Sequence, residues 1–201
     1  TDTLFISGSS LIPIFEVDLS AQSSKNFFLD SVSLINGNSA GNTNIYILGS
    51  GALYFEGDSL SISNSYFAEN KSVYEGGAIY FKGGVIQIKN SIFDRNEAVN
   101  EGGAIKLESL NISVEVANSI FKNNVSKKGG AFSTESYSYT SVGVSGYSRF
   151  NFYKTDIINN SSSEDGGAIF SYSRHSVGGS YANTSNAYSN SNIVFDQCNI
   201  K

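Results

Sequence analysis

Short runs in which apolar and polar residues alternate recur along the chain, separated by Gly, Ser and Asn. The runs 85–88 (VIQI) and 104–107 (AIKL) show this two-residue period, which is typical of a strand with one buried face. The 14 Phe and 12 Tyr residues also suit pleated surfaces. We therefore predict an all-β protein.

The alternating runs belong to a longer sequence repeat. Residues 64–81 (NSYFAENKSVYEGGAIYF) and 90–107 (NSIFDRNEAVNEGGAIKL) are the clearest pair, at a shift of 26 residues. Further copies occupy 118–132 and 154–170, segments 50–65 and 76–91 match at the same shift, and Phe195, Cys198 and Ile200 begin another copy. Three short strands and their turns fill about 26 residues, which is one coil of a parallel β-helix. We predict such a solenoid, with coils stacked about 4.8 Å apart.

Matching positions of a solenoid lie above one another, so the repeat predicts columns of side chains. An inward stack contains Phe67, Phe93, Phe121, Ile157 and Ile200, and a stack of small residues contains Ser65, Ser91, Ser119, Thr155 and Cys198. A ladder of bonded amides contains Asn70, Asn96, Asn124 and Asn160. Glycine pairs at 76/77, 102/103, 129/130 and 166/167 are expected to supply backbone angles or close approaches that other residues do not allow.

Charged residues also fall into columns, and opposite charges on neighbouring strands stabilise each other. The expected contacts are Glu56–Lys82–Glu108, Glu69–Arg95, Lys71–Glu97, Asp94–Lys122 and Glu101–Lys128. Glu75 directly over Glu101 is the like-charged exception.

The regular coils differ in length at one connector, so their insertions should emerge on one side of the solenoid. We treat residues 1–201 as one β-helix segment of a longer repeat protein, with degenerate coils in 1–49, regular repeats in 50–170 and inserted loops at 133–149 and 171–192. The insertions are rich in Tyr, Ser, Gly and Asn, a mixture that antibody loops use for contact. They are either a binding face for protein or glycan, or solvated loops that cover the flank. The candidate contact residues are Tyr137, Tyr139, Tyr147, Tyr172, Tyr181 and Tyr188.

The first coils admit two alignments. Asp30, Ser31 and Val32 with Asn36 resemble one degenerate copy, whereas Asn38-Ser39 with Asn44 fits a shift of 26. Residues 3–6 (TLFI) are expected at the position of 78–81 (AIYF). Neither end carries a polar cap, so we expect either a longer parent chain or end-to-end stacking into a fibre.

Composition removes several classes of function. The net charge of −5 supplies no surplus of cations for phosphates, so we expect no nucleic-acid partner. One Cys and one His exclude a disulfide framework and a cysteine-built or histidine-rich metal site. Cys198 is interpreted as a small core residue. No run approaches the roughly 18 apolar residues of a spanning helix, so we expect no membrane insertion of this segment.

Two kinds of chemistry remain open. Sequons occur at Asn70, Asn111, Asn124, Asn159, Asn160 and Asn183. The ladder should hide Asn70, Asn124 and Asn160, which leaves Asn183, Asn111 and Asn159 as candidate glycosylation sites. Glu75 over Glu101 is a conceivable calcium site or acid–base pair for an enzyme acting on polysaccharides, and an exposed charged rim is the simpler interpretation. We predict no catalytic, cofactor-binding or metal-binding residue, and no cofactor.

The FxxN motifs at 67–70, 93–96 and 121–124, with GGAI at 76–79, 102–105 and 166–169 and GGAF at 129–132, resemble the repeats of chlamydial polymorphic outer membrane proteins. The resemblance covers residues 64–170 and implies a right-handed parallel β-helix of the autotransporter-passenger and pectate-lyase-like type, displayed on the cell surface as an adhesin. We therefore expect a non-enzymatic extracellular stalk that serves adhesion or assembly. Its expected partners are a second copy, a glycan or a cell-surface protein. The alternative is a polysaccharide lyase or hydrolase.

Overall fold

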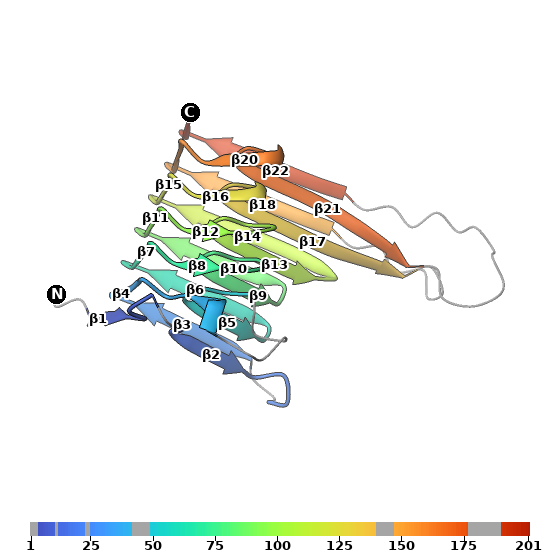
Figure 1. Ribbon diagram of the computed structural model, residues 1–201. Helices are drawn as coiled ribbons and strands as arrows, with labels where there is room; N and C mark the ends of the chain where they lie inside the picture. Colours follow the sequence, from blue (N-terminus) through green and yellow to red (C-terminus); the bar gives the residue numbers. More distant parts are fainter. Residues whose placement is uncertain (1–3, 11, 23–24, 42–48, 140–146, 177–189) are drawn as a thin grey trace.

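Parallel strands make up nearly all regular structure in the computed structural model, which describes residues 4–10, 12–22, 25–41, 49–139, 147–176 and 190–201. Successive coils stack along one axis, from the N-terminal coil to the C-terminal coil (Figure 1). Every strand pairing within these ranges is parallel and joins neighbouring coils. One 3-10 turn, η1 (Ser39–Gly41), lies between the first coils. The predicted all-β solenoid is therefore confirmed.

Four sheets run along the stack. Sheet A contains β1 (Leu4–Ser7), β4 (Val32–Ile35), β7 (Tyr66–Ala68), β11 (Ile92–Asp94), β15 (Ile120–Lys122), β19 (Asp156–Ile158) and β23 (Asn199–Ile200). Sheet B contains β2 (Phe15–Asp18), β5 (Leu53–Glu56), β9 (Ile79–Lys82), β13 (Ile105–Ser109), β17 (Phe132–Tyr139) and β21 (Ile169–Ser176). Sheet C contains β3 (Asn26–Asp30), β6 (Ser59–Ser63), β10 (Val85–Lys89), β14 (Asn111–Ala117), β18 (Tyr147–Tyr153) and β22 (Asn190–Asp196). Sheet D contains β8 (Lys71–Ser72), β12 (Glu97–Ala98), β16 (Val125–Lys128) and β20 (Ser161–Asp165).

Each regular coil thus holds four strands, and the expectation of three was wrong. The missed strands belong to sheet D, where β8 and β12 are only two residues long. A pair of residues shows no alternation along the chain, and the longer β16 (VSKK) and β20 (SSSED) are almost wholly polar. Their regular structure is visible only in the pairing between coils.

The predicted inward stack forms the centre of the core. Phe67, Phe93 and Phe121 face one another on adjacent strands of sheet A, with ring centroids 4.7 Å apart at each step. Ile157 continues the column in full burial, and Ile200 ends it in the last described coil. This spacing equals the distance between strands, so each ring packs against its counterpart one coil away.

The asparagine ladder is also confirmed. Asn70 Nδ2 donates to Asn96 Oδ1 at 3.0 Å, and Asn96 Nδ2 donates to Asn124 Oδ1 at 3.0 Å. Asn124 Nδ2 in turn donates to Asn160 Oδ1 at 2.8 Å. The first three side chains are fully buried, so the ladder satisfies amides that have no access to water.

Each glycine pair serves two separate needs. Gly76 has a φ of +60°, which lies in the left-handed region that favours glycine. Gly77 instead lies against the next coil, where an added Cβ would come within 2.0 Å of the Gly103 carbonyl oxygen. Other corners use Asn in the left-handed region, as at Asn64 with a φ of 50°.

The start of the chain differs from both expected alignments. Leu4–Ser7 pairs with Val32–Ile35 in sheet A, whereas residues 15–18 take the place in sheet B that was assigned to 3–6. Ser33 pairs with Tyr66, which places Gly37 rather than Asn36 beside Asn70. Asn38 pairs with Lys71, so the alternative shift of 26 is wrong as well. The chain between β4 and β5 is longer than the equivalent connection in the regular coils, so alignment by residue spacing failed in this part of the sequence.

The predicted insertions begin and end as strands. β17 and β21 pair over eight residues, and β18 and β22 pair over seven. These four strands extend beyond the earlier coils on the same side of the stack (Figure 1). Residues 133–139, 147–149, 171–176 and 190–192, expected as loop, are therefore strand. Their polar composition hid the pairing between coils.

Candidate functional site

Charged columns on the outer surface match the predicted register. Arg95 lies 2.7 Å from Glu69, and Lys71 lies 2.9 Å from Glu97, with all four side chains about half exposed. Lys122 approaches the buried Asp94 at 3.5 Å. The exposed pairs each contribute about 0.2–1 kcal/mol, so they favour the register without dominating stability.

A buried lysine on the outer side of sheet B was not foreseen as a special residue. Lys106 has no exposed surface, and its Nζ contacts Glu101 Oε2 and lies 3.6 Å from Glu135 Oε2. Ser133 Oγ donates to Glu101 at 2.8 Å, and Tyr172 OH donates to Glu135 at 2.5 Å. The alternating run 104–107 predicted a strand, but it gave no signal that this outward side chain would be buried against Glu101, Glu135 and Tyr172.

Glu75 belongs to the same cluster. It pairs in register with Glu101, and both side chains are partly buried. Burial raises the pKa of Glu75 to about 7, Lys106 opposes this shift, and the carboxylates of Glu108, Glu101 and Glu135 add to it. The expected exposed rim at Glu75 and Glu101 is therefore wrong, because the two carboxyl groups gather around a buried cation.

The predicted contact between Glu101 and Lys128 holds for the backbone, which forms a parallel bridge. Their side chains have other partners, however: Lys128 Nζ lies 3.9 Å from Glu164 Oε2, and Glu101 Oε2 contacts Lys106 Nζ. Among the described residues, no group of three or more His, Cys, Asp or Glu side chains has an arrangement suited to a metal ion.

The candidate tyrosines divide into three groups. Tyr147, at the start of β18, is 46 % exposed. Tyr172 is half-buried, and its ring centroid lies 5.2 Å from Lys106 Nζ. The side chains of Tyr137 and Tyr139, and residues Tyr181 and Tyr188, lie outside the described part of the structure.

The candidate glycosylation residues also differ in access. Asn159 is exposed at a corner, with a φ of 54°. Asn111 is half-buried, and its side-chain oxygen is buried without a hydrogen-bond partner among the described residues. Asn183 lies outside them. Exposure favours Asn159 over Asn111 for modification, which stays a prediction. Cys198 is half-buried and donates from Sγ to the Asp196 carbonyl at 3.3 Å.

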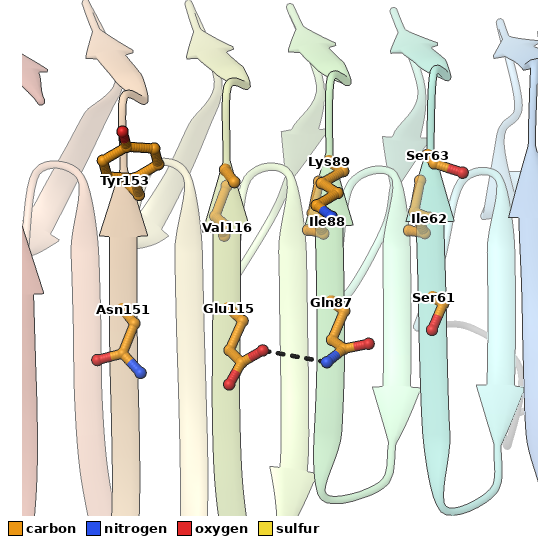
Figure 2. Close-up of a pocket in the computed structure, with 11 residues that line it drawn as sticks. Ser61, Ile62, Ser63, Gln87, Ile88, Lys89, Glu115, Val116, Asn151 and Tyr153 are labelled. Atoms are coloured by element: carbon orange, nitrogen blue, oxygen red, sulfur yellow. Dashed lines mark hydrogen bonds between the residues drawn. The ribbon is translucent and has the colours of Figure 1, made fainter.

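A groove of about 470 Å³ lies on the outer face of sheet C. Figure 2 shows a row of polar side chains across it, one from each of β6, β10, β14 and β18: Ser61, Gln87, Glu115 and Asn151. Gln87 Nε2 donates to Glu115 Oε2 at 3.0 Å. We call these four residues the polar row. Their signal in the sequence was the polar positions of the alternating runs.

Tyr153 and Lys89 border the polar row, two residues further along their strands (Figure 2). Tyr153 is 40 % exposed, and Lys154 Nζ lies 4.9 Å from the centroid of its ring.

Within the described ranges, no helix is long and apolar enough to cross a membrane.

The stacked coils define a parallel β-helical repeat protein. The Chlamydia polymorphic membrane protein repeat matches the chain at residues 64–89 and 154–172, less than a quarter of its 201 residues. The resemblance drawn from the FxxN and GGAI motifs is therefore confirmed at two places. Comparisons with curated proteins and with solved structures gave no match.

Proposed function

We propose that this chain is part of a non-enzymatic extracellular repeat protein that forms a rigid β-helical stalk and serves adhesion at a cell surface. The observation that carries the proposal is the continuous axial register. Sheet A joins seven strands in one direction, with its aromatic column packed at the strand spacing. A structure of this kind holds distant coils at fixed positions along one axis. The matched repeat, named for membrane proteins of Chlamydia, supports a place at the cell surface.

Location is the first test. Antibodies against the purified chain should label intact cells of the native source, and external protease should remove the label. A periplasmic or cytosolic pool that stays protected until the cells are opened would refute the proposal.

The adhesive role needs a separate test on the insertions. Replacing residues 177–189 with a short Gly-Ser linker leaves β21 and β22 in place. If the insertion is the contact region, this variant loses attachment to target cells while keeping its unfolding midpoint. Unchanged attachment would show that binding lies elsewhere on the stalk.

End-to-end association into a fibre is a further part of the proposal, because open β edges pair readily with other chains. Sedimentation at increasing protein concentration should show rods that lengthen by whole copies. A single species of constant size would contradict it.

The rival function is a carbohydrate-active enzyme. Its support is Glu75, whose pKa near 7 would suit a general acid. Glu101, its neighbour, accepts hydrogen bonds from Lys106 and Ser133. Oligosaccharide cleavage that disappears in Glu75→Gln or Glu101→Gln would overturn the non-enzymatic proposal.

A further inference from the structure

We propose that the outer face of sheet C binds an uncharged, extended oligosaccharide that runs across the strands, parallel to the axis of the stack. The inference rests on the proposed function, because it names the ligand class of the adhesive stalk. It assigns the contact to the polar row and Tyr153 rather than to the insertions.

The hydrogen-bonding capacity of the polar row is the first argument. Its members offer hydroxyl, amide and carboxylate groups on four successive coils. The side chains of Ser61 and Asn151 make no hydrogen bond to the described part of the protein. Gln87 donates one hydrogen bond from its side-chain amide, to Glu115. Neutral hydroxyl groups of a sugar can both donate and accept, so they complement such a mixed row.

Charge selects an uncharged ligand. Lys89 and Glu115 are the only charged residues that line the groove within the described ranges, so their charges cancel. A polyanion would meet Glu115, and a polycation would meet Lys89. Ile62, Ile88 and Val116 belong to the core and are at most 2 % exposed, so the accessible surface of the groove is formed by the polar row and the residues that border it. Balanced charge on a mostly neutral polar surface favours a ligand with neutral polar edges.

Tyr153 supplies the aromatic surface that the apolar face of a sugar ring requires. It stands at the edge of the row (Figure 2) and is 40 % exposed. Lys154 Nζ lies 4.9 Å from the centroid of its ring. An aromatic ring offers a large contact area at a small cost in side-chain entropy. The ring and the row together therefore present both kinds of contact.

The spacing of the row sets the direction of the ligand. Neighbouring strands are about 4.8 Å apart, close to the length of one pyranose unit in an extended chain. Successive sugars can therefore meet successive members of the row without losing register. Four coils accommodate about four sugar units.

A second groove on the stack, along sheet D, fits an uncharged ligand less well. It is lined by Glu69, Arg95, Lys71 and Glu97, which pair with each other. A ligand would have to break those pairs. The groove on sheet C has only one internal hydrogen bond between side chains across its row, from Gln87 to Glu115.

Titration calorimetry on the whole chain tests the inference. The probes are neutral β-1,4-linked hexasaccharides of glucose and of N-acetylglucosamine, with an oligogalacturonate of equal length as the anionic comparison. We expect at least one neutral probe to bind and the anionic probe to bind at least about tenfold more weakly. Tyr153→Ala should weaken binding about tenfold, and Asn151→Ala about fivefold.

Tyr74→Ala is the matched control, because Tyr74 is 51 % exposed but does not line the groove. It should leave the affinity unchanged. The inference is overturned if no neutral probe binds, if Tyr153→Ala binds as wild type does, or if Tyr74→Ala weakens binding equally. If the protein is found on the cell surface but binds no sugar, the proposed sugar site is refuted and the proposed surface stalk is not. If the protein binds sugar but is confined inside the cell, the proposed surface stalk is refuted and the sugar site is not.

Discussion

Replacing Asn96 with Ala tests whether the amide ladder holds the coils together. Asn96 Oδ1 accepts from the backbone N–H of Asn70 at 3.2 Å and from its side-chain amide at 3.0 Å. Asn96 Nδ2 donates to the Phe67 carbonyl and to Asn124 Oδ1, both at 3.0 Å. Alanine removes all four bonds at a position with no exposed surface.

The magnitude follows from the groups that lose a partner. The Asn124 oxygen keeps the backbone N–H of residue 96, and the Asn70 amide keeps the Leu34 carbonyl. The Asn70 backbone N–H and the Phe67 carbonyl lose the bond to the side chain. Each buried group without its partner costs about 1–3 kcal/mol, so the two together give an expected loss of about 2–6 kcal/mol.

Urea unfolding followed by circular dichroism measures this loss. Asn151→Ala is the matched control, since its side chain makes no hydrogen bond to the described residues, and it should change the free energy of unfolding by less than about 0.5 kcal/mol. A cost for Asn96→Ala below about 1 kcal/mol, or equal to that of the control, would refute the ladder as a stabilising element.

Three further outcomes follow from particular contacts. The pKa of Glu75 is raised from 4.5 to about 7 in the folded protein, so its contribution to stability is present below about pH 4.5 and is lost as the pH rises through about 7. In Glu75→Gln, the fall in the free energy of unfolding between these pH values should be smaller by about 1–2 kcal/mol, allowing for partial solvent screening. Urea titrations in which the variant and the wild type lose equal stability over this range would contradict the raised pKa of Glu75. Lys106→Met leaves the carboxylates of Glu101 and Glu135 without their cation, so the free energy of unfolding should fall by about 3–5 kcal/mol in the same assay. A fall near zero would contradict a buried ion pair at Lys106. Gly77→Ala places a Cβ within 2.0 Å of the Gly103 carbonyl, while Gly167→Ala meets nothing within 4 Å. The first should lower the melting temperature and the second should not, and equal melting temperatures would be inconsistent with the close approach.

The features that could be predicted from the sequence are those that repeat. Phe67, Phe93 and Phe121 occupy equivalent positions, and stacking at the strand spacing follows from the equivalence alone. The same holds for the asparagine ladder. In both columns one residue type recurs over several successive coils, because the environment of each member is another member.

The features that escaped prediction depend on contacts between different positions. Lys106 shares its column with Tyr80 and Ser133, so the column gives no common chemistry. It contacts Glu101, Glu135 and Tyr172, which lie at other positions of the coil, and no period in the chain reports those contacts. The fourth strand of each coil escaped for a similar reason. β8 and β12 are two residues long, and β16 and β20 are almost wholly polar, so none of the four has an alternating pattern of its own.

The same contrast separates the parts of the coil that stabilise from those that can recognise a ligand. Inward positions must pack against copies of themselves, and a change in one coil disturbs the coils on both sides. Outward positions on sheet C carry no such constraint, and the polar row changes from Ser61 to Gln87, Glu115 and Asn151 along the axis. A solenoid can therefore alter the order of its outward groups while the inward columns keep the spacing fixed. Fixed spacing and variable chemistry therefore occur together along the outer face of a sheet, and a repeating ligand can be recognised there.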